Sequence, residues 1–169
     1  QQSGGHVVVH SAPGQGTTFE VLFPRAGQRA DSVAPDATAP SVPRGTERVL
    51  VVEDDATLRN LTERMLSWLG YEVHSAANAS EAQRVMRGLR DDVQLLITDI
   101  VMPGQDGTEL ARTLLARAPS LKVLLVSGYS EHQGAQRDGF PTSAAFLQKP
   151  FDRDTLAHRV RELLDAPAA

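Results

Sequence analysis

Residues 47–165 alternate short apolar runs with segments of helical period, and this alternation limits the fold more than any other feature. Five runs are predicted strands: Val49–Val52, Tyr71–Ser75, Leu95–Thr98, Val123–Val126 and Ala144–Leu147. Strands separated by helices are typical of βα units around a parallel sheet. The pattern therefore predicts an α/β fold, a small doubly wound five-stranded sheet with its functional side chains at the carboxyl ends of the strands.

The segments between the strands predict amphipathic helices. Asp55 is the predicted N-cap of the first helix, and Asn78 that of the second, with Glu81 as its capping-box partner. The apolar faces hold Leu58, Leu61, Met65, Leu66 and Leu69 in the first helix, Ala82, Val85, Met86 and Leu89 in the second, Leu110, Leu114 and Leu115 in the third, and Leu156, Val160, Leu163 and Leu164 in the last. Residues 130–140 contain two glycines and no aliphatic stripe, which predicts a short fourth helix.

Composition excludes several classes of function. The chain has 169 residues, 17 basic and 21 acidic, and no cysteine, so disulfides and thiolate metal sites are excluded and five dispersed histidines are set aside as zinc ligands. The basic residues are scattered, so we expect no nucleic-acid contact, and no apolar run approaches the roughly 20 residues that span a bilayer. We expect a cytoplasmic segment that does not itself contact a membrane. It would be a piece of a longer parent protein, which upstream segments could anchor in a membrane.

Composition also divides the chain. Residues 25–46 are rich in Ala, Pro, Ser and Asp and hold almost no large apolar side chain, which predicts a flexible linker. It separates a short N-terminal piece, residues 1–24, from the compact block 47–165.

Charged and polar residues follow four of the predicted strands. Glu53 and Asp54 follow the first strand, Asp99 the third, Ser127 the fourth and Lys149 the fifth. Carboxylates that converge at one sheet edge repel one another, and a divalent cation and an ammonium relieve this; hard oxygen ligands favour Mg²⁺. This set suits phosphoryl transfer, with Asp99 as nucleophile, Mg²⁺ and Lys149 stabilising charge, and Ser127 donating a hydrogen bond to a phosphoryl oxygen.

At these residues the chain resembles the receiver domains of two-component response regulators, over nearly all of residues 47–165. The resemblance implies a flavodoxin-like sheet of strand order 2-1-3-4-5 and assigns phosphoacceptor to Asp99 and Mg²⁺ binding to Glu53, Asp54, Asp99 and the backbone carbonyl of Val101. It also implies a switch pair, Ser127 and Phe146, and a cis peptide bond between Lys149 and Pro150. Glu53 stands where Asp is commoner in the family, and Phe146 lacks a hydroxyl.

Residues 4–23 show a strand–loop–strand pattern around SAPGQGT. This stretch resembles the last glycine box of the histidine-kinase ATP-binding domain, which places Gly14, Gly16 and Thr17 beside the nucleotide. His6 and His10 alternate with valines and are predicted strand-face residues, not phosphoacceptors. Only the tail of that domain is present, so ATP binds only in the intact parent.

The module order, kinase tail, linker and receiver, resembles a hybrid sensor histidine kinase. The resemblance implies an ATP-dependent, homodimeric parent that autophosphorylates a histidine and passes the phosphoryl group to Asp99, in cis or in trans. A histidine phosphotransfer protein is the second candidate partner. The linker would then raise the effective concentration of the receiver at the histidine.

Four other functions are weighed. A haloacid-dehalogenase phosphatase also uses Asp, Ser or Thr, Lys and Mg²⁺, but it needs Asp where Glu53 stands. A receiver-like interaction module without phosphorylation is opposed by the five filled positions, and a dinucleotide-binding domain by the lack of glycines directly after the first strand. A freestanding response regulator would begin near residue 47, so residues 1–24 decide between it and the hybrid kinase.

Overall fold

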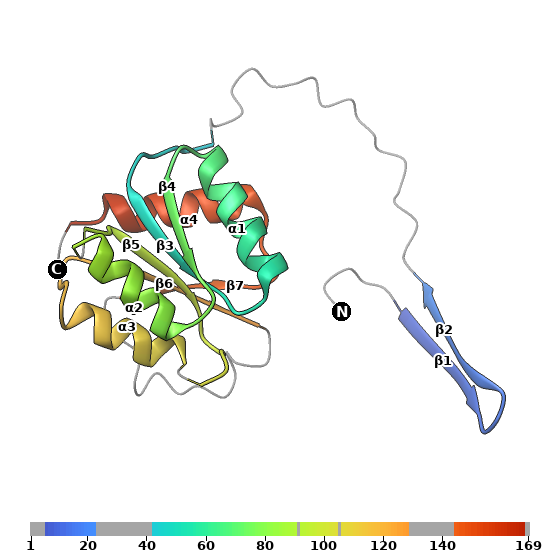
Figure 1. Cartoon of the computed structure of the whole chain (residues 1–169). Helices are drawn as coiled ribbons and strands as arrows, with labels where there is room; N and C mark the ends of the chain where they lie inside the picture. Colours follow the sequence, from blue (N-terminus) through green and yellow to red (C-terminus); the bar gives the residue numbers. More distant parts are fainter. Residues whose placement is uncertain (1–5, 23–41, 91, 105, 129–143, 168–169) are drawn as a thin grey trace, which may run out of the picture. The chain divides into compact units, whose positions relative to one another are not determined.

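A computed structural model describes residues 6–22, 42–90, 92–104, 106–128 and 144–167 of the chain. The chain divides into two compact units, Gln1–Pro40 and Ser41–Ala169. Figure 1 shows both units.

The larger unit is built on a five-stranded sheet with strand order β4-β3-β5-β6-β7, in which every neighbouring pair is parallel. Its strands are β3 (Arg48–Val52), β4 (Glu72–Ala76), β5 (Leu95–Asp99), β6 (Lys122–Ser127) and β7 (Ala144–Gln148). In chain order within this unit, that is the predicted order 2-1-3-4-5. The prediction of a doubly wound, flavodoxin-like sheet is confirmed.

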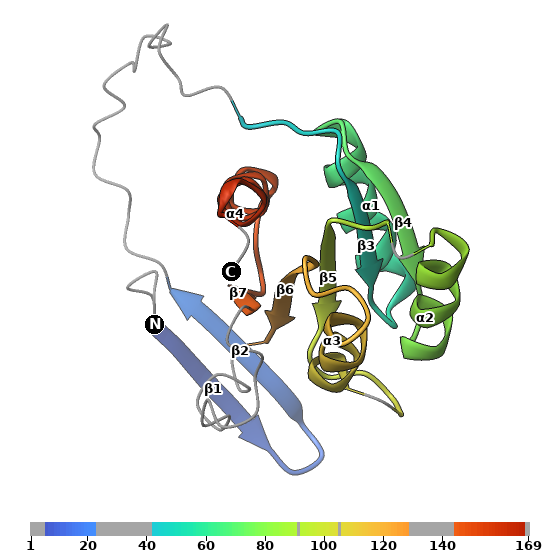
Figure 2. The ribbon, with the colours of Figure 1, turned by 90° about the vertical axis from the view of Figure 1, so that its left-hand side faces the viewer.

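Within the described part of this unit, four helices cover the two faces of the sheet: α1 (Ala56–Trp68), α2 (Ala79–Gly88), α3 (Gly107–Leu115) and α4 (Arg153–Asp165). The buried residues of α2 and α3 share one apolar cluster, and those of α1 and α4 share the other. Figure 2 shows α4 and the α2–α3 pair on opposite sides of the strands. Along β3, Leu50 and Val52 enter the first cluster and Val49 and Val51 the second, because successive side chains of a strand point to opposite faces. The helix predicted over 130–140 lies outside the described residues.

The prediction for α1 was wrong at its first turns. Leu66 and Leu69 are fully buried, as expected, but Leu58 and Leu61 are 42% and 49% exposed. Periodicity places all of them on one side of the helix, yet only the later turns meet the second cluster. The first turns of α1 therefore present apolar side chains on the surface.

Side-chain caps fix where the helices begin. The carboxylate of Asp55 accepts from the backbone N–H groups of Thr57 and Leu58, at 2.7 and 3.0 Å. The side chain of Asn78 accepts from Glu81 N–H at 2.9 Å, while the Glu81 carboxylate accepts from the backbone N–H of Ala77, one residue before the cap. Both predicted N-caps are confirmed, and each offsets N–H groups that a helix start leaves unpaired.

The described end of the predicted linker, residues 42–46, packs on the larger unit. Val42 lies against the second apolar cluster, and Gly45 N–H donates to the carbonyl of Leu69 at 3.1 Å. Glu47 follows with an ion pair to Arg161 of α4 at 2.7 Å. These contacts attach the start of this unit to the ends of α1 and α4.

The smaller unit contains an antiparallel hairpin of β1 (His6–Ala12) and β2 (Gly16–Leu22). Gln15 N–H donates to Ala12 C=O at 3.0 Å, and Gly14, the third residue of this turn, has φ +75°. Pro13 and Gly14 therefore occupy the positions that a type II turn favours. The predicted strand–loop–strand pattern is confirmed.

Candidate functional site

The site lies at the carboxyl ends of adjacent strands. In the β3–β5 pair Val52 lies opposite Thr98, so the next residues, Glu53 and Asp99, leave the sheet side by side. Lys149 follows β7, which completes this edge two strands away from β5. Parallel pairing thus brings together side chains that are 46 and 50 residues apart in the chain.

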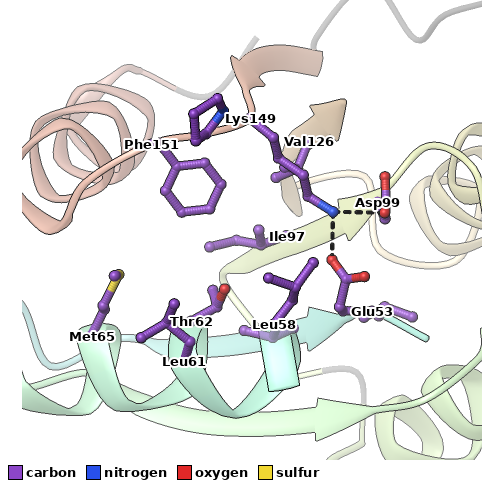
Figure 3. A pocket seen from close by; sticks show the side chains of 13 residues that line it. Glu53, Leu58, Leu61, Thr62, Met65, Ile97, Asp99, Val126, Lys149 and Phe151 are labelled. Atoms are coloured by element: carbon purple, nitrogen blue, oxygen red, sulfur yellow. Dashed lines mark hydrogen bonds and ion pairs between the residues drawn. The ribbon is translucent and has the colours of Figure 1, made fainter. Parts of the chain in front are cut away.

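Lys149 bridges two carboxylates. Its Nζ lies 2.7 Å from Glu53 Oε2 and 2.7 Å from Asp99 Oδ2, and Figure 3 shows the ammonium between them. The side chains of Glu53 and Asp99 are only 9% and 13% exposed. Two charge-assisted hydrogen bonds, one to each carboxylate, hold the ammonium between Glu53 and Asp99 in this shielded place.

Burial and pairing act on the site in opposite directions. Burial raises the pKa of the Glu53 carboxyl, and the Lys149 ammonium only partly offsets this. Burial acts to lower the pKa of Lys149, but its hydrogen bonds to Asp99 and Glu53 outweigh it, so the pKa of the ammonium lies above its ordinary value. Lys149 is therefore held protonated beside the acids.

Glu53, Asp54 and Asp99 form the acidic cluster, and each offers one oxygen within 4.8 Å of the others. Glu53 is buried, Asp99 is half-buried and Asp54 is exposed, so the cluster opens to solvent on the Asp54 side. Oxygen ligands and an open side fit Mg²⁺, which binds through one or two carboxylates and keeps several waters. The donor chemistry of these residues fits the cation that the sequence implied.

Hydrogen bonds from Thr98 and Gly107 hold the backbone at Asp99 and Ile100. The Thr98 hydroxyl donates to the Asp99 carbonyl at 3.0 Å, and Gly107 N–H donates to the Ile100 carbonyl at 2.9 Å. Gly107 has no room for a side chain, because a Cβ there would overlap the Asp99 carbonyl oxygen. The first residue of α3 thus packs directly under the candidate nucleophile.

The remaining predicted residues of this unit lie near the same edge. Ser127 is the last residue of β6 and fully buried, and its carbonyl accepts from Lys149 N–H at 2.8 Å. Phe146, in β7, packs half-buried against the first apolar cluster, and the Val101 side chain is 57% exposed. The Lys149–Pro150 bond is cis, as predicted. The switch roles of Ser127 and Phe146 and the metal role of the Val101 carbonyl stay predictions.

The glycine-box residues Gly14, Gly16 and Thr17 lie in the hairpin of the smaller unit. Gly14 and Gly16 have φ +75° and +83°, a conformation that glycine adopts without strain. The Thr17 hydroxyl lies 2.9 Å from the Ser11 hydroxyl across the strand pair. The turn accounts for Gly14, whereas Gly16 is the first residue of β2, and the place of both beside a nucleotide stays a prediction.

Sequence reasoning missed two features of the site. An apolar pocket of about 400 Å³ adjoins Lys149 and Asp99, and Leu58, Leu61, Met65 and Phe151 are among its lining residues (Figure 3). Arg59, in the first turn of α1, donates to the backbone of the Glu53–Asp54 loop. The sequence signals were weak: Arg59 lies six residues after Glu53, and Leu58 and Leu61 belong to the apolar stripe of the same helix.

Fold and site together define a receiver domain of two-component signalling. The model of the response regulator receiver domain matches residues 49–161, and the chain belongs to this family. Within the described residues, no helix is both long and apolar enough to cross a bilayer.

Similar proteins cover the chain to different extents. The sensor kinase CckA of Brucella abortus (strain 2308) is 37% identical over 172 residues, which cover 98% of this chain and 18% of that kinase. The receiver protein CpdR of the same organism is 32% identical, over 71% of this chain and 98% of its own. The chain thus spans under a fifth of the kinase relative and matches nearly all of CpdR.

Solved structures agree with the fold. The crystal structure of the receiver domain from the hybrid histidine kinase CckA has 35% identity and a TM-score of 0.55, covering 70% of this chain and 99% of that domain. A CheY-like receiver domain from Methanospirillum hungatei JF-1 has 29% identity and a TM-score of 0.61, covering 72% and 95%. Both matches leave about the same share of this chain uncovered.

Proposed function

We propose that this receiver accepts a phosphoryl group from a phosphohistidine onto Asp99, with Mg²⁺ held by the acidic cluster and the Val101 carbonyl. The observation that carries the proposal is the bridge from Lys149 to both Glu53 and Asp99, with Asp54 within reach. A salt bridge that served stability alone would need one carboxylate, whereas three at one edge are costly unless cations are bound there. Their convergence therefore favours phosphoryl chemistry.

The step is an in-line displacement. A carboxylate oxygen of Asp99 attacks phosphorus; the new O–P bond forms as the P–N bond to the donor imidazole breaks, and the imidazole leaves with the bonding electron pair. Bound Mg²⁺ would supply positive charge to the phosphoryl oxygens. On this proposal Lys149 adds positive charge from the other side, and the hydroxyl of Ser127, at the end of β6, donates a hydrogen bond to a phosphoryl oxygen.

Labelling with acetyl phosphate tests the nucleophile. With Mg²⁺, the wild-type chain is expected to gain one phosphoryl group by intact mass, and Asp99→Ala to gain none, because that variant lacks the carboxylate oxygen that attacks phosphorus. Asp154→Asn is the control, since Asp154 is an exposed acid in the first turn of α4. Equal labelling of Asp99→Ala and the control would contradict the assignment.

We propose further that the chain is the C-terminal part of a hybrid sensor histidine kinase. The match to the sensor kinase CckA extends over 98% of the chain and so includes the hairpin. On this proposal residues 1–24 are the tail of an ATP-binding domain, 25–46 a linker and 47–165 the receiver. Histidine autophosphorylation with ATP, homodimer formation and transfer in cis or in trans then belong to the parent. A freestanding response regulator is the alternative, favoured by the match to CpdR over 98% of its length.

The exposed start of α1 suits contact with the protein that donates the phosphoryl group. Leu58 and Leu61 are surface-exposed and line the pocket beside Asp99 and Lys149. An apolar surface next to a nucleophile is a natural contact for the protein that carries the phosphoryl group, since large exposed apolar side chains mark interaction sites. We place the phosphohistidine domain, or a histidine phosphotransfer protein, on this surface.

Two donors separate docking from chemistry. Leu61→Ser is expected to slow transfer from a phosphorylated histidine-kinase core about tenfold, while labelling by acetyl phosphate, which needs no docking, continues at a similar rate. Transfer from the protein donor at the wild-type rate would remove this surface from the proposal and leave the role of Asp99 untouched.

A further inference from the structure

Arg59 donates hydrogen bonds to three consecutive backbone carbonyls. Its side-chain Nη1 donates to Glu53 C=O at 2.6 Å and to Asp54 C=O at 3.3 Å, and its backbone N–H donates to Asp55 C=O at 2.9 Å. On the opposite side of the loop, Glu53 N–H donates to the Ala76 carbonyl of β4 at 3.2 Å. The loop between β3 and α1 is thus held at each of its three residues.

These bonds occupy the backbone and leave the acidic side chains free. The Asp55 carboxylate is used as the cap of α1, and Glu53 and Asp54 turn their carboxylates towards Asp99. A guanidinium carries several N–H donors in a fixed plane, so one side chain can serve two carbonyls. Lys149 binds carboxylate oxygens, whereas the Arg59 guanidinium donates to main-chain oxygens of this loop.

From this arrangement we infer that Arg59 is a positioning residue for the metal site, which fixes the Glu53–Asp54 backbone so that both carboxylates face Asp99. The inference rests on the proposed function, because it concerns the cation that the acidic cluster would hold. Groups that orient metal ligands from behind contribute strongly, and their removal typically weakens metal binding about 10- to 100-fold.

The sign of the effect separates positioning from simple charge. A cation near the cluster repels Mg²⁺, so if Arg59 acted only through its charge, removing it would tighten Mg²⁺ binding. If Arg59 positions the loop, its removal lets the carbonyls of Glu53 and Asp54 turn and weakens binding. The two effects oppose each other, and positioning predicts that the loss is larger.

The test is a Mg²⁺ titration of the full chain, followed by the backbone amide resonances of Glu53, Asp54 and Asp99. Arg59→Gln is expected to bind Mg²⁺ about tenfold more weakly than the wild type. Arg64→Gln is the matched control, with the same loss of charge at an exposed position of the same helix, and it is expected to bind within about twofold of the wild type. Arg59→Lys, which keeps the charge and one donor group, is expected to recover part of the loss.

A kinetic measurement separates positioning from a general loss of structure. In acetyl phosphate labelling, Arg59→Gln is expected to need about tenfold more Mg²⁺ for half-maximal rate, with the rate at saturating Mg²⁺ within about twofold of the wild type. A variant damaged throughout would lose the saturated rate as well.

Each outcome of the Mg²⁺ titration either supports or overturns the inference. Mg²⁺ binding by Arg59→Gln that equals the Arg64→Gln control, or exceeds it, overturns the inference. If Arg59→Gln does not fold, Arg59→Lys decides, and wild-type affinity in that variant overturns the inference. A wild-type chain that shows no saturable Mg²⁺ response contradicts the proposed function itself, and that result is distinct from a failure of Arg59 alone.

Discussion

Replacing Gly107 with alanine is the sharpest structural perturbation of the site. A Cβ at this position would overlap the Asp99 carbonyl oxygen and lie 2.8 Å from Thr98 Oγ1 and 2.9 Å from the Asp99 carbonyl carbon. Backbone atoms cannot swing aside as the end of a flexible side chain can. The start of α3 must therefore move away from β5, and the hydrogen bond from Gly107 N–H to Ile100 C=O stretches or breaks.

The expected cost follows from these two effects. Forcing a methyl group into a packed interior costs about 1–3 kcal/mol, and loss of one buried hydrogen bond about 1 kcal/mol. We therefore expect Gly107→Ala to lower the free energy of unfolding by about 3 kcal/mol. For a domain of this size, that corresponds to a fall in Tm of about 12 °C, at about 4 °C per kcal/mol.

Urea unfolding, read by far-UV circular dichroism, measures the change in free energy. Gly88→Ala is the matched control, because a Cβ at Gly88, the last residue of α2, meets no atom within 4 Å. Alanine is the better helix former, so this control is expected to gain about 0.5 kcal/mol. The same change of residue should thus have opposite signs at two helix ends, and a Gly107→Ala variant within about 0.5 kcal/mol of the wild type would refute the packing argument.

Two further predictions concern ion pairs. Lys149→Met is expected to slow acetyl phosphate labelling about 100-fold, the loss typical of one electrostatic donor, while Mg²⁺ binding tightens because Glu53 and Asp99 lose their bound cation; weaker Mg²⁺ binding, read by amide shifts, would count against this. The hydrogen bond from Arg161 holds the pKa of Glu47 below its ordinary value, despite partial burial. A depressed carboxyl pKa stabilises the fold above the unfolded pKa of about 4.3. The side chains of Arg161 and Glu47 are 20% and 27% exposed, so Glu47→Gln is expected to lower the free energy of unfolding by about 1 kcal/mol at pH 7. This difference should disappear as the pH falls through the lowered pKa of Glu47, and unfolding curves from pH 7 to pH 3 would detect that change. An unchanged difference at pH 3 would contradict the prediction.

The sequence carried the fold and the chemistry of the site because both depend on short-range patterns. Apolar runs located all five strands of the larger unit within one residue at each end. The rule that parallel strands expose their carboxyl ends at one edge then brought Asp99 and Lys149 together, although they are 50 residues apart. No long-range contact had to be known in advance.

The predictions that were wrong concern residues whose burial depends on contacts between distant parts of the chain. Leu58 and Leu61 fit the apolar stripe of α1, but they lie on turns that the second cluster does not cover. Gly45 lies in a stretch whose composition predicts a linker, yet a Cβ there would overlap Glu47 and Tyr71, so the chain is tightly packed at that point. Composition and periodicity describe local preference, and neither tells which surface a residue will meet.

The supports of the site follow one division of labour. Arg59, Thr98 and Gly107 contact main-chain atoms of the acid-bearing segments, while Lys149 contacts the carboxylates themselves. Changes in the first group should weaken Mg²⁺ binding, because the carboxylates lose their placement. Removal of Lys149 should instead tighten Mg²⁺ binding and slow phosphoryl acceptance, because the carboxylates stay in place without their ammonium. Opposite signs in one titration would therefore distinguish the residues that build the metal site from the residue that acts on the phosphoryl group.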